Sequence, residues 1–198
     1  MRKALLTALM ILCLAACGST GQQMEHARSR LTEARAMSLT AQIQAGTDSY
    51  TLEYAWDGET WTALVIRPEL IAGISASMGP GGTDIAYDGA ILAVGDLTER
   101  GVSPMGALPM ILEALDTGTV DSVWTEGELL AGKFIYDDDI SVTVWFDGTG
   151  TPVAGELTER GIVKATVTMT NVQIKEATSI ETTENEDLGG DQPGESGA

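Results

Sequence analysis

Cysteine and histidine are nearly absent from this sequence, and their scarcity limits the chemistry that the chain can support. The 198 residues include two cysteines and a single histidine, His26. A nucleophilic triad would have to use His26 as its base, yet this residue lies close to the start of the chain, away from the predicted strands. We therefore expect a solvated helix residue at His26. We also expect neither a disulfide nor a cysteine-based metal site, because Cys13 precedes a predicted cleavage point and leaves only one cysteine.

Basic residues are scarce as well. Eleven lysines and arginines face 29 aspartates and glutamates, which gives a formal net charge of −18 at pH 7. This charge would repel the phosphate backbone of a nucleic acid, and it would also repel anionic lipid headgroups. We therefore expect no nucleic-acid partner.

A long hydrophobic run is also missing, although the chain begins with a short one. Met1-Arg2-Lys3 supplies positive charge, and the apolar stretch from Ala4 to Leu14 is shorter than the about 20 residues that cross a bilayer as a helix. These features are typical of a secretory signal peptide. Leu14-Ala15-Ala16-Cys17 resembles a bacterial lipobox, which implies cleavage before Cys17 and a diacylglyceryl group on its sulfur. The simpler alternative is an ordinary signal peptide followed by a chance cysteine.

From these features we predict a signal peptide over residues 1–16 and a lipidated tether over residues 17–23. The acyl chains on Cys17 would hold the protein at the extracytoplasmic face of the cell membrane. Loss of Arg2 and Lys3 with the signal peptide would change the formal net charge from −18 to −20.

Hydrophobic periodicity divides the rest of the chain into two helices and many short strands. The first helix has apolar residues at helical spacing from Met24 to Ala34, and the second has them around Leu108–Leu115, with Pro109 placed to open it and Gly118 to close it. Elsewhere the period is two, and turns such as Asp88-Gly89 separate the segments. The predicted strands are Met37–Gln44, Tyr50–Trp56, Trp61–Ile66, Leu70–Met78, Ile85–Tyr87, Ile91–Val94, Ser122–Thr125, Leu129–Tyr136, Ile140–Phe146, Pro152–Glu159 and Ile162–Ile174.

An antiparallel meander interrupted by helices predicts an α+β fold. The two helices are the available covers for one sheet face, so we expect a strongly curved antiparallel sheet, an open half-barrel, with helices over its concave face. This domain would span residues 24–175. Residues 176–198 contain seven acidic and no basic residues, which predicts a disordered acidic tail. We expect Ile162–Ile174 to be an edge strand, and thus a surface for docking or for a homodimer.

Four stretches of sequence carry a family resemblance. In order they are IRPELIAG, IAYDGAIL, SPMGALPMILEAL and ISVTVWFDGTGTPVAGELTERGIVKATVTMTNVQI. Together they resemble the half-barrel lipoprotein superfamily that includes LolA, LppX and the clostridial GerS-type germination lipoproteins, over about Met37 to Lys175. GerS-type proteins are the most similar in format, which implies a lipid-anchored adaptor that binds a cell-wall hydrolase during spore cortex maturation. LolA and LppX imply instead a carrier of a lipid or lipoprotein.

Acidic residues suggest two further kinds of site. Asp137-Asp138-Asp139 could offer carboxylate oxygens to a cation, but it lies between two strands and lacks the EF-hand spacing, so we expect a solvated turn. Glycosidase-type pairs could be drawn from Glu53, Asp57, Glu126, Glu128 and Glu156, although nothing in the sequence places two of these across a cleft. Gly79-Pro80-Gly81-Gly82 is not followed by the Lys-Ser or Lys-Thr of a phosphate-binding loop. We expect no metal and no cofactor.

Large apolar side chains in or beside the strands suggest a hydrophobic binding site. The candidates for contact with such a ligand are Trp56, Trp61, Met78, Met110, Trp124, Trp145 and Met169. The alternative is that these residues form the core beneath the helices. The segment Met105–Leu115 could serve as both core and movable lid. We expect a non-catalytic, membrane-anchored adaptor for a protein partner, and the rival hypothesis is a carrier or sensor of a hydrophobic ligand, which requires a continuous apolar cavity.

Overall fold

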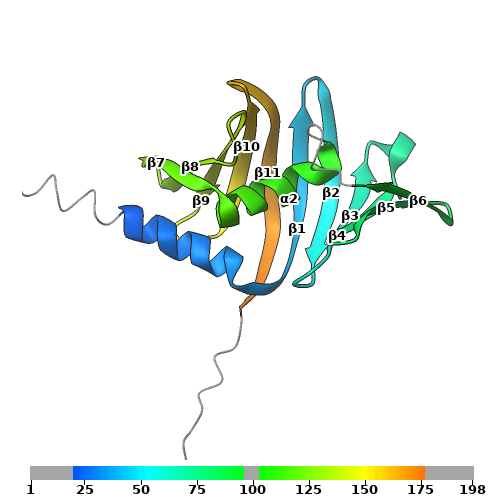
Figure 1. Ribbon diagram of the computed structural model, residues 1–198, viewed down its shortest axis with the longest axis horizontal. Helices are drawn as coiled ribbons and strands as arrows, with labels where there is room; N and C mark the ends of the chain where they lie inside the picture. The colour runs from blue at the N-terminus through cyan, green and yellow to red at the C-terminus, as the bar shows by residue number, and fades with distance from the viewer. Residues whose placement is uncertain (1–19, 96–102, 177–198) are drawn as a thin grey trace, which may run out of the picture.

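The structure, a computed structural model, describes residues 20–95 and 103–176 and contains one large antiparallel sheet with helices on one face (Figure 1). The predicted signal peptide, Cys17 and most of the predicted acidic tail lie outside the described residues. The strands are β1 (Ala34–Ala45), β2 (Asp48–Trp56), β3 (Trp61–Arg67), β4 (Ser75–Gly79), β5 (Gly82–Tyr87), β6 (Ala90–Gly95), β7 (Thr119–Glu126), β8 (Leu129–Ile135), β9 (Ile140–Phe146), β10 (Pro152–Glu159) and β11 (Ile162–Glu176).

The first and the last strand of the sheet lie side by side at its centre. Its strand order is β6-β5-β4-β3-β2-β1-β11-β10-β9-β8-β7, so the chain meanders from β1 to one edge, crosses to the other, and returns to β1. The prediction that Ile162–Ile174 forms an edge strand is wrong, because β11 lies between β1 and β10. Pairing of the first strand with the last leaves no local signal in the sequence. The two edges are β6 and β7.

Helix α2 (Pro104–Thr117) makes the crossing between the two sheet edges and packs on β1 and on β8 to β11. Ser103 caps its start, since the Ser103 Oγ accepts a hydrogen bond from the amide of Gly106 at 3.0 Å, and Pro104 occupies the first helical turn. The expectation that Pro109 opens the helix is therefore wrong. Pro109 lies inside α2, and the true N-terminal signal is Ser103-Pro104.

The first helix covers residues 20–32, so it begins earlier than Met24 and ends before Ala34, where β1 starts. Residues 20–23 of the predicted tether are thus helical. This helix lies on the same sheet face as α2 (Figure 1), and Met24, Ala27 and Leu31 are buried against the sheet. The Arg28 Nη2 donates to the carbonyl of Asp116 at 2.6 Å, which joins the first helix to the C-terminal end of α2.

Two glycines allow the helices to approach the sheet closely. A Cβ at Gly132 would lie 2.6 Å from the Met24 Cε, and a Cβ at Gly155 would lie 2.9 Å from the Ile111 Cδ1. The first helix and α2 therefore each rest on a strand position without a side chain. The helices and the sheet are therefore closely packed at these two positions.

The two sheet faces differ as period-two alternation requires. Along β1, Met37, Leu39, Ala41 and Ile43 are buried beneath the helices, and the residues between them face the other side. The predicted α+β fold, a curved antiparallel sheet with helices covering its concave face, is confirmed. The predicted strand from Leu70 begins too early: Glu69–Ile71 is a short 3-10 helix, η1, and β4 begins only at Ser75.

Candidate binding groove

A row of four large apolar residues crosses the concave face from β1 to β4. Met37 pairs with Trp56, Trp56 with Trp61, and Trp61 with Met78. Directly paired residues in an antiparallel sheet point to the same face, so these four side chains lie side by side. Met37 and Met78 are buried, whereas the two tryptophans are partly exposed.

The aromatic rings of this row form a cluster. The indoles of Trp56 and Trp61 stack with a centroid distance of 5.9 Å and an interplanar angle of 20°. The ring of Tyr54 meets Trp61 edge-on, at 6.3 Å and 81°. Both arrangements are preferred aromatic geometries, which hold the indoles in fixed orientations. The result is a rigid apolar floor.

The β2–β3 hairpin fixes the two tryptophans opposite each other. One carboxylate oxygen of Asp57 accepts hydrogen bonds from the amides of Glu59 at 3.0 Å and Thr60 at 2.8 Å. These two bonds hold the pKa of Asp57 below its usual range, and the bond from Thr60 has the larger effect. Asp57 therefore stabilises the turn that places Trp61 beside Trp56.

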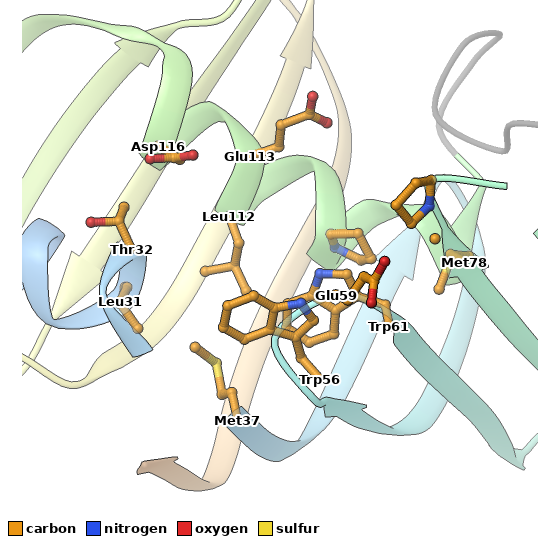
Figure 2. A pocket seen from close by; sticks show the side chains of 13 residues that line it. Leu31, Thr32, Met37, Trp56, Glu59, Trp61, Met78, Leu112, Glu113 and Asp116 are labelled. Atoms are coloured by element: carbon orange, nitrogen blue, oxygen red, sulfur yellow. The ribbon is translucent and has the colours of Figure 1, made fainter. Parts of the chain in front are cut away.

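Above this floor the helices leave a groove of about 450 Å³. Figure 2 shows the Leu112 side chain directed from α2 toward the tryptophans, with Leu31 and Thr32 of the first helix at one side. Pro109 and the Gly79-Pro80 turn complete the walls. This volume lies within the range of about 300–1,000 Å³ that is usual for small-ligand pockets.

The rim of the groove is acidic. Glu59, Glu113 and Asp116 line it, and no lysine or arginine is among the described residues that line it. Figure 2 shows Glu113 and Asp116 on the α2 side and Glu59 close to the tryptophans. A groove with an apolar floor and acidic rim favours an apolar group that is flanked by positive charge.

The remaining space between helices and sheet is filled. Leu108, Ile111 and Leu115 of α2 are fully buried, as are Phe134 and Leu157 of the sheet. The concave face of the described residues thus holds a packed core with a groove at one end. A second hollow, of about 540 Å³, lies on the opposite face, and its lining includes the polar residues Ser38, Thr40 and Gln173.

Three of the seven predicted ligand-contacting residues meet in the groove: Trp56, Trp61 and Met78. Met110 and Met169 are core residues, 2% and 4% exposed. Their contact with a hydrophobic ligand stays a prediction, and so does lipidation of Cys17, which lies outside the described residues.

Trp124 and Trp145 lie on the opposite sheet face. Both pair with Ala131 of β8, and the neighbouring residues Val123 and Val144 belong to the concave face. The Trp145 Nε1 donates to a carboxylate oxygen of Glu126 at 2.8 Å. These two indoles therefore do not contribute to the groove. Strict alternation along Ile140–Phe146 predicts from the sequence alone that Trp145 and Val144 point to different sheet faces.

Sequence reasoning missed the role of Tyr54. Its hydroxyl lies between the carbonyls of Pro104 and Met105, 3.0 Å from each, and burial raises its pKa. Pro109 has no N–H to offer the carbonyl of Met105, its partner four residues earlier in the helix. The Tyr54 hydroxyl supplies the missing donor and so joins the groove floor to α2.

The other suggested sites are dispersed. Asp137 accepts hydrogen bonds from the amides of Asp139 and Ile140 in the β8–β9 turn, while Asp139 forms an ion pair with Arg160 at 2.8 Å. None of the five suggested glycosidase carboxylates lines the groove. Within residues 20–95 and 103–176, no three His, Cys, Asp or Glu side chains gather to hold a metal ion. Neither helix there has the length and apolarity of a membrane span.

No protein-family model matches the chain, and no curated protein matches it either. An uncharacterized conserved protein from Thermus thermophilus has a similar structure, with a TM-score of 0.51, 7% identity, and coverage of 80% of this chain and 89% of that one. A LolA superfamily protein from Nitrosomonas europaea has a TM-score of 0.42 and 9% identity, with coverage of 77% and 94%. A structure of the Clostridioides difficile CwlD amidase with the GerS lipoprotein has a TM-score of 0.44 and 15% identity, with coverage of 72% and 88%. At these identities the likeness shows the fold alone. The superfamily that the sequence resembles is thus found among the structural neighbours of this chain.

Proposed function

We propose that this chain is a lipid-anchored binding protein at the outer face of the cell membrane, and that the concave groove holds an apolar anchor of a protein partner. The observation that supports this most directly is the row Met37, Trp56, Trp61 and Met78, which leaves a stacked indole pair accessible inside a groove. Tryptophans in such partly enclosed positions are typical centres of protein interfaces.

The acidic rim specifies the partner further. Glu59, Glu113 and Asp116 are among the residues that line the groove, and the whole sequence carries a net charge of −18. A partner segment with one or two large apolar side chains and neighbouring lysines or arginines would satisfy both features. Positive charge on the partner would also speed association with a chain of this net charge.

The resemblance to GerS-type lipoproteins gives this partner a class. In the Clostridioides difficile structure GerS is in complex with the CwlD amidase. By analogy, the partner proposed for this chain is a cell-wall hydrolase, which the chain would bind without taking part in catalysis. Lipidation at Cys17 would keep the pair beside the membrane.

A carrier of a hydrophobic ligand is the second candidate. The apolar floor of the groove favours it, because stacked indoles and thioethers also suit an acyl chain. The packed core counts against it, since Leu108, Ile111 and Leu115 occupy the space that a continuous cavity would need. At about 450 Å³ the groove would admit a short apolar group.

Co-purification from the source cells tests the proposal. The tagged full-length chain, its Trp61→Ala variant and its Glu113→Lys variant are recovered with their bound proteins and lipids. We expect a cell-wall hydrolase with the unchanged chain and a loss of about thirtyfold in Trp61→Ala, as for a central interface tryptophan worth about 2 kcal/mol. Glu113 is exposed, so Glu113→Lys tests the acidic rim without disturbing the core.

Trp124→Ala is the matched control, because Trp124 lies on the opposite sheet face. It should leave recovery of the hydrolase unchanged. Equal recovery with Trp61→Ala, Glu113→Lys and Trp124→Ala would show that the partner does not bind in the groove. A lipid present at one molecule per chain, and lost in Trp61→Ala, would establish the carrier function instead.

A further inference from the structure

We propose that strand β6 is a second docking surface, at which an extended, basic and apolar segment of a protein partner adds a twelfth strand to the sheet. The inference rests on the proposed function only in requiring a protein partner. The surface itself is separate from the groove, whose floor ends at Met78 of β4. Figure 1 shows β6 at one end of the sheet, far from the start of the first helix.

The outer edge of β6 pairs with no other strand of the described residues. Within the described residues β6 has β5 as its single neighbour. Asp88 and Gly89 both have positive φ angles, 49° and 81°, and connect Tyr87 to Ala90 in a two-residue hairpin. In such a hairpin the flanking pair exchanges hydrogen bonds and every second pair does the same, so Ala90 and Leu92 bond to β5. The N–H and C=O groups of Ile91 and Ala93 therefore point outward.

The sequence of β6 lacks the devices that usually protect a sheet edge. Ala90–Gly95 contains no charged residue and no proline, and all six residues are exposed. A register shift after Ala93 disturbs only the end of the strand. The other edge, β7, carries Asp121 and Glu126, and Asp121 lies 3.9 Å from Lys133 of β8. Natural proteins block edges in the manner of β7, whereas an edge such as β6 is a template for another strand.

Exposed large apolar residues are concentrated in the segment of the chain that forms β3 to β6. Of the ten large apolar residues that are exposed in the described residues, seven lie between positions 64 and 94. Leu70 is 89% exposed, Ile91 73% and Leu92 65%. Ile91 and Leu92 point to opposite sheet faces, so an added strand would meet an apolar neighbour on each side. Exposed apolar side chains along an open strand edge suit contact with an added apolar strand.

Charge selects the occupant among the possible ones. Strand β5 and the β5–β6 turn carry Asp84 and Asp88 and no basic residue, and the whole sequence has a net charge of −18. A second copy would bring the same negative charge, and an anionic lipid surface would also be repelled. An extended segment with lysines or arginines among apolar residues matches both the charge and the open strand edge.

Hydrogen exchange measured by NMR tests this placement. The probe is a ten-residue peptide of alternating lysine and valine, added to the full-length lipidated chain in detergent, and a glutamate–valine peptide is its matched control. We expect the amides of Ile91 and Ala93 to exchange at least about tenfold more slowly with the lysine peptide, since each gains a backbone hydrogen bond. The amides of Ala90 and Leu92, already bonded to β5, and those of β7 should not change. In Ile91→Pro, which lacks one outward donor, protection of Ala93 should be lost.

Three results would overturn the inference: no protection of Ile91 and Ala93 with the lysine peptide, protection that rises with protein concentration without peptide, and protection by phosphatidylcholine vesicles. The second identifies another copy as the occupant, and the third identifies a lipid surface. The groove experiment is independent of these amides. If Trp61→Ala releases the hydrolase while the amides of Ile91 and Ala93 stay unprotected, this inference fails and the proposed function stands. If Trp61→Ala retains the hydrolase while the lysine peptide protects these two amides, the proposed function fails and this inference stands.

Discussion

Tyr54 shows how a single side chain joins the sheet to its covering helix. Its ring packs edge-on against Trp61 in the groove floor, and its hydroxyl lies 3.0 Å from the carbonyls of Pro104 and Met105. One of these carbonyls lacks a helical partner because Pro109 has no N–H. The hydroxyl thus compensates for the proline inside α2 and fixes the helix above the tryptophans.

Replacing Tyr54 with phenylalanine removes this hydroxyl and keeps the ring. We expect the free energy of unfolding to fall by about 1–3 kcal/mol, because a partly buried carbonyl is left without a donor. Urea unfolding measures the change. Tyr87→Phe is the matched control, since the Tyr87 side chain is 52% exposed, and it should alter stability by less than about 0.5 kcal/mol.

Pro109→Ala provides a second check on the same contact. An alanine at position 109 would supply the N–H that the Met105 carbonyl lacks, so Tyr54→Phe should cost less in the Pro109→Ala background than in the unchanged chain. Equal costs in the two backgrounds would show that the hydroxyl does not replace the helical donor.

Some of the individual residues of the candidate site can be predicted from the sequence. Trp56, Trp61 and Met78 stand out as large apolar residues on strands, and pairing of β2, β3 and β4 brings them together. Trp145 meets the same criterion but points to the other sheet face, since it alternates with the buried Val144. The residue type alone does not say which of the two faces a strand residue occupies. The acids Glu59, Glu113 and Asp116 come from a turn and a helix, and only tertiary packing places them on one rim.

Among the secondary-structure elements, helix α2 packs across the concave face of the sheet. It begins at Ser103-Pro104 and ends at Gly118, whose amide donates to the Ala114 carbonyl at 3.0 Å. The last turn of α2 carries the acidic Asp116 and no basic residue, which opposes the helix dipole. Arg28 of the first helix donates to the Asp116 carbonyl there. The C-terminal end of α2 therefore depends on contacts from outside the helix.

Gly118 is required by close packing at this end. A Cβ there would overlap the carbonyl oxygen of Ala114 and would lie 3.0 Å from the carbonyl oxygen of Ile135. Both are backbone atoms, which cannot rotate away, so we expect Gly118→Ala to lower the free energy of unfolding by about 1–3 kcal/mol. Thermal or urea unfolding checks this value.

Gly148→Ala is the control for this substitution, because a Cβ at Gly148 has no heavy atom within 4 Å. It should change the free energy of unfolding by less than about 0.5 kcal/mol. A similar loss in both variants would mean that glycine itself, and not the space around Gly118, determines stability at these turns.

Most elements can be predicted from the sequence, because their signals are local. The Ile140–Phe146 and Pro152–Glu159 strands have the predicted bounds, and period-two alternation accounts for both. Leu70 resembles a strand residue by its hydrophobicity, yet it is 89% exposed in η1. The position of β11 beside β1 depends on pairing between residues more than a hundred positions apart, which no local pattern contains.

At the scale of the whole molecule, the groove and the β6 edge lie apart. The groove lies between the helices and the sheet, and β6 forms an edge at the far end of the sheet (Figure 1). A protein anchored at Cys17 could therefore present both the groove and β6 to one partner. The net negative charge of the chain favours a partner with basic segments.

The central claim is that the groove holds part of a cell-wall hydrolase, and photo-crosslinking from inside the groove tests it most directly. Benzoylphenylalanine would replace Leu112, which is directed toward the tryptophans (Figure 2), and in a parallel variant Thr62, which is exposed on the opposite sheet face. After irradiation of living cells, crosslinked products are identified by mass spectrometry. We predict a crosslink to a cell-wall hydrolase from position 112 and none from position 62. A lipid as the sole product from position 112, or equal crosslinking from both positions, would contradict this claim.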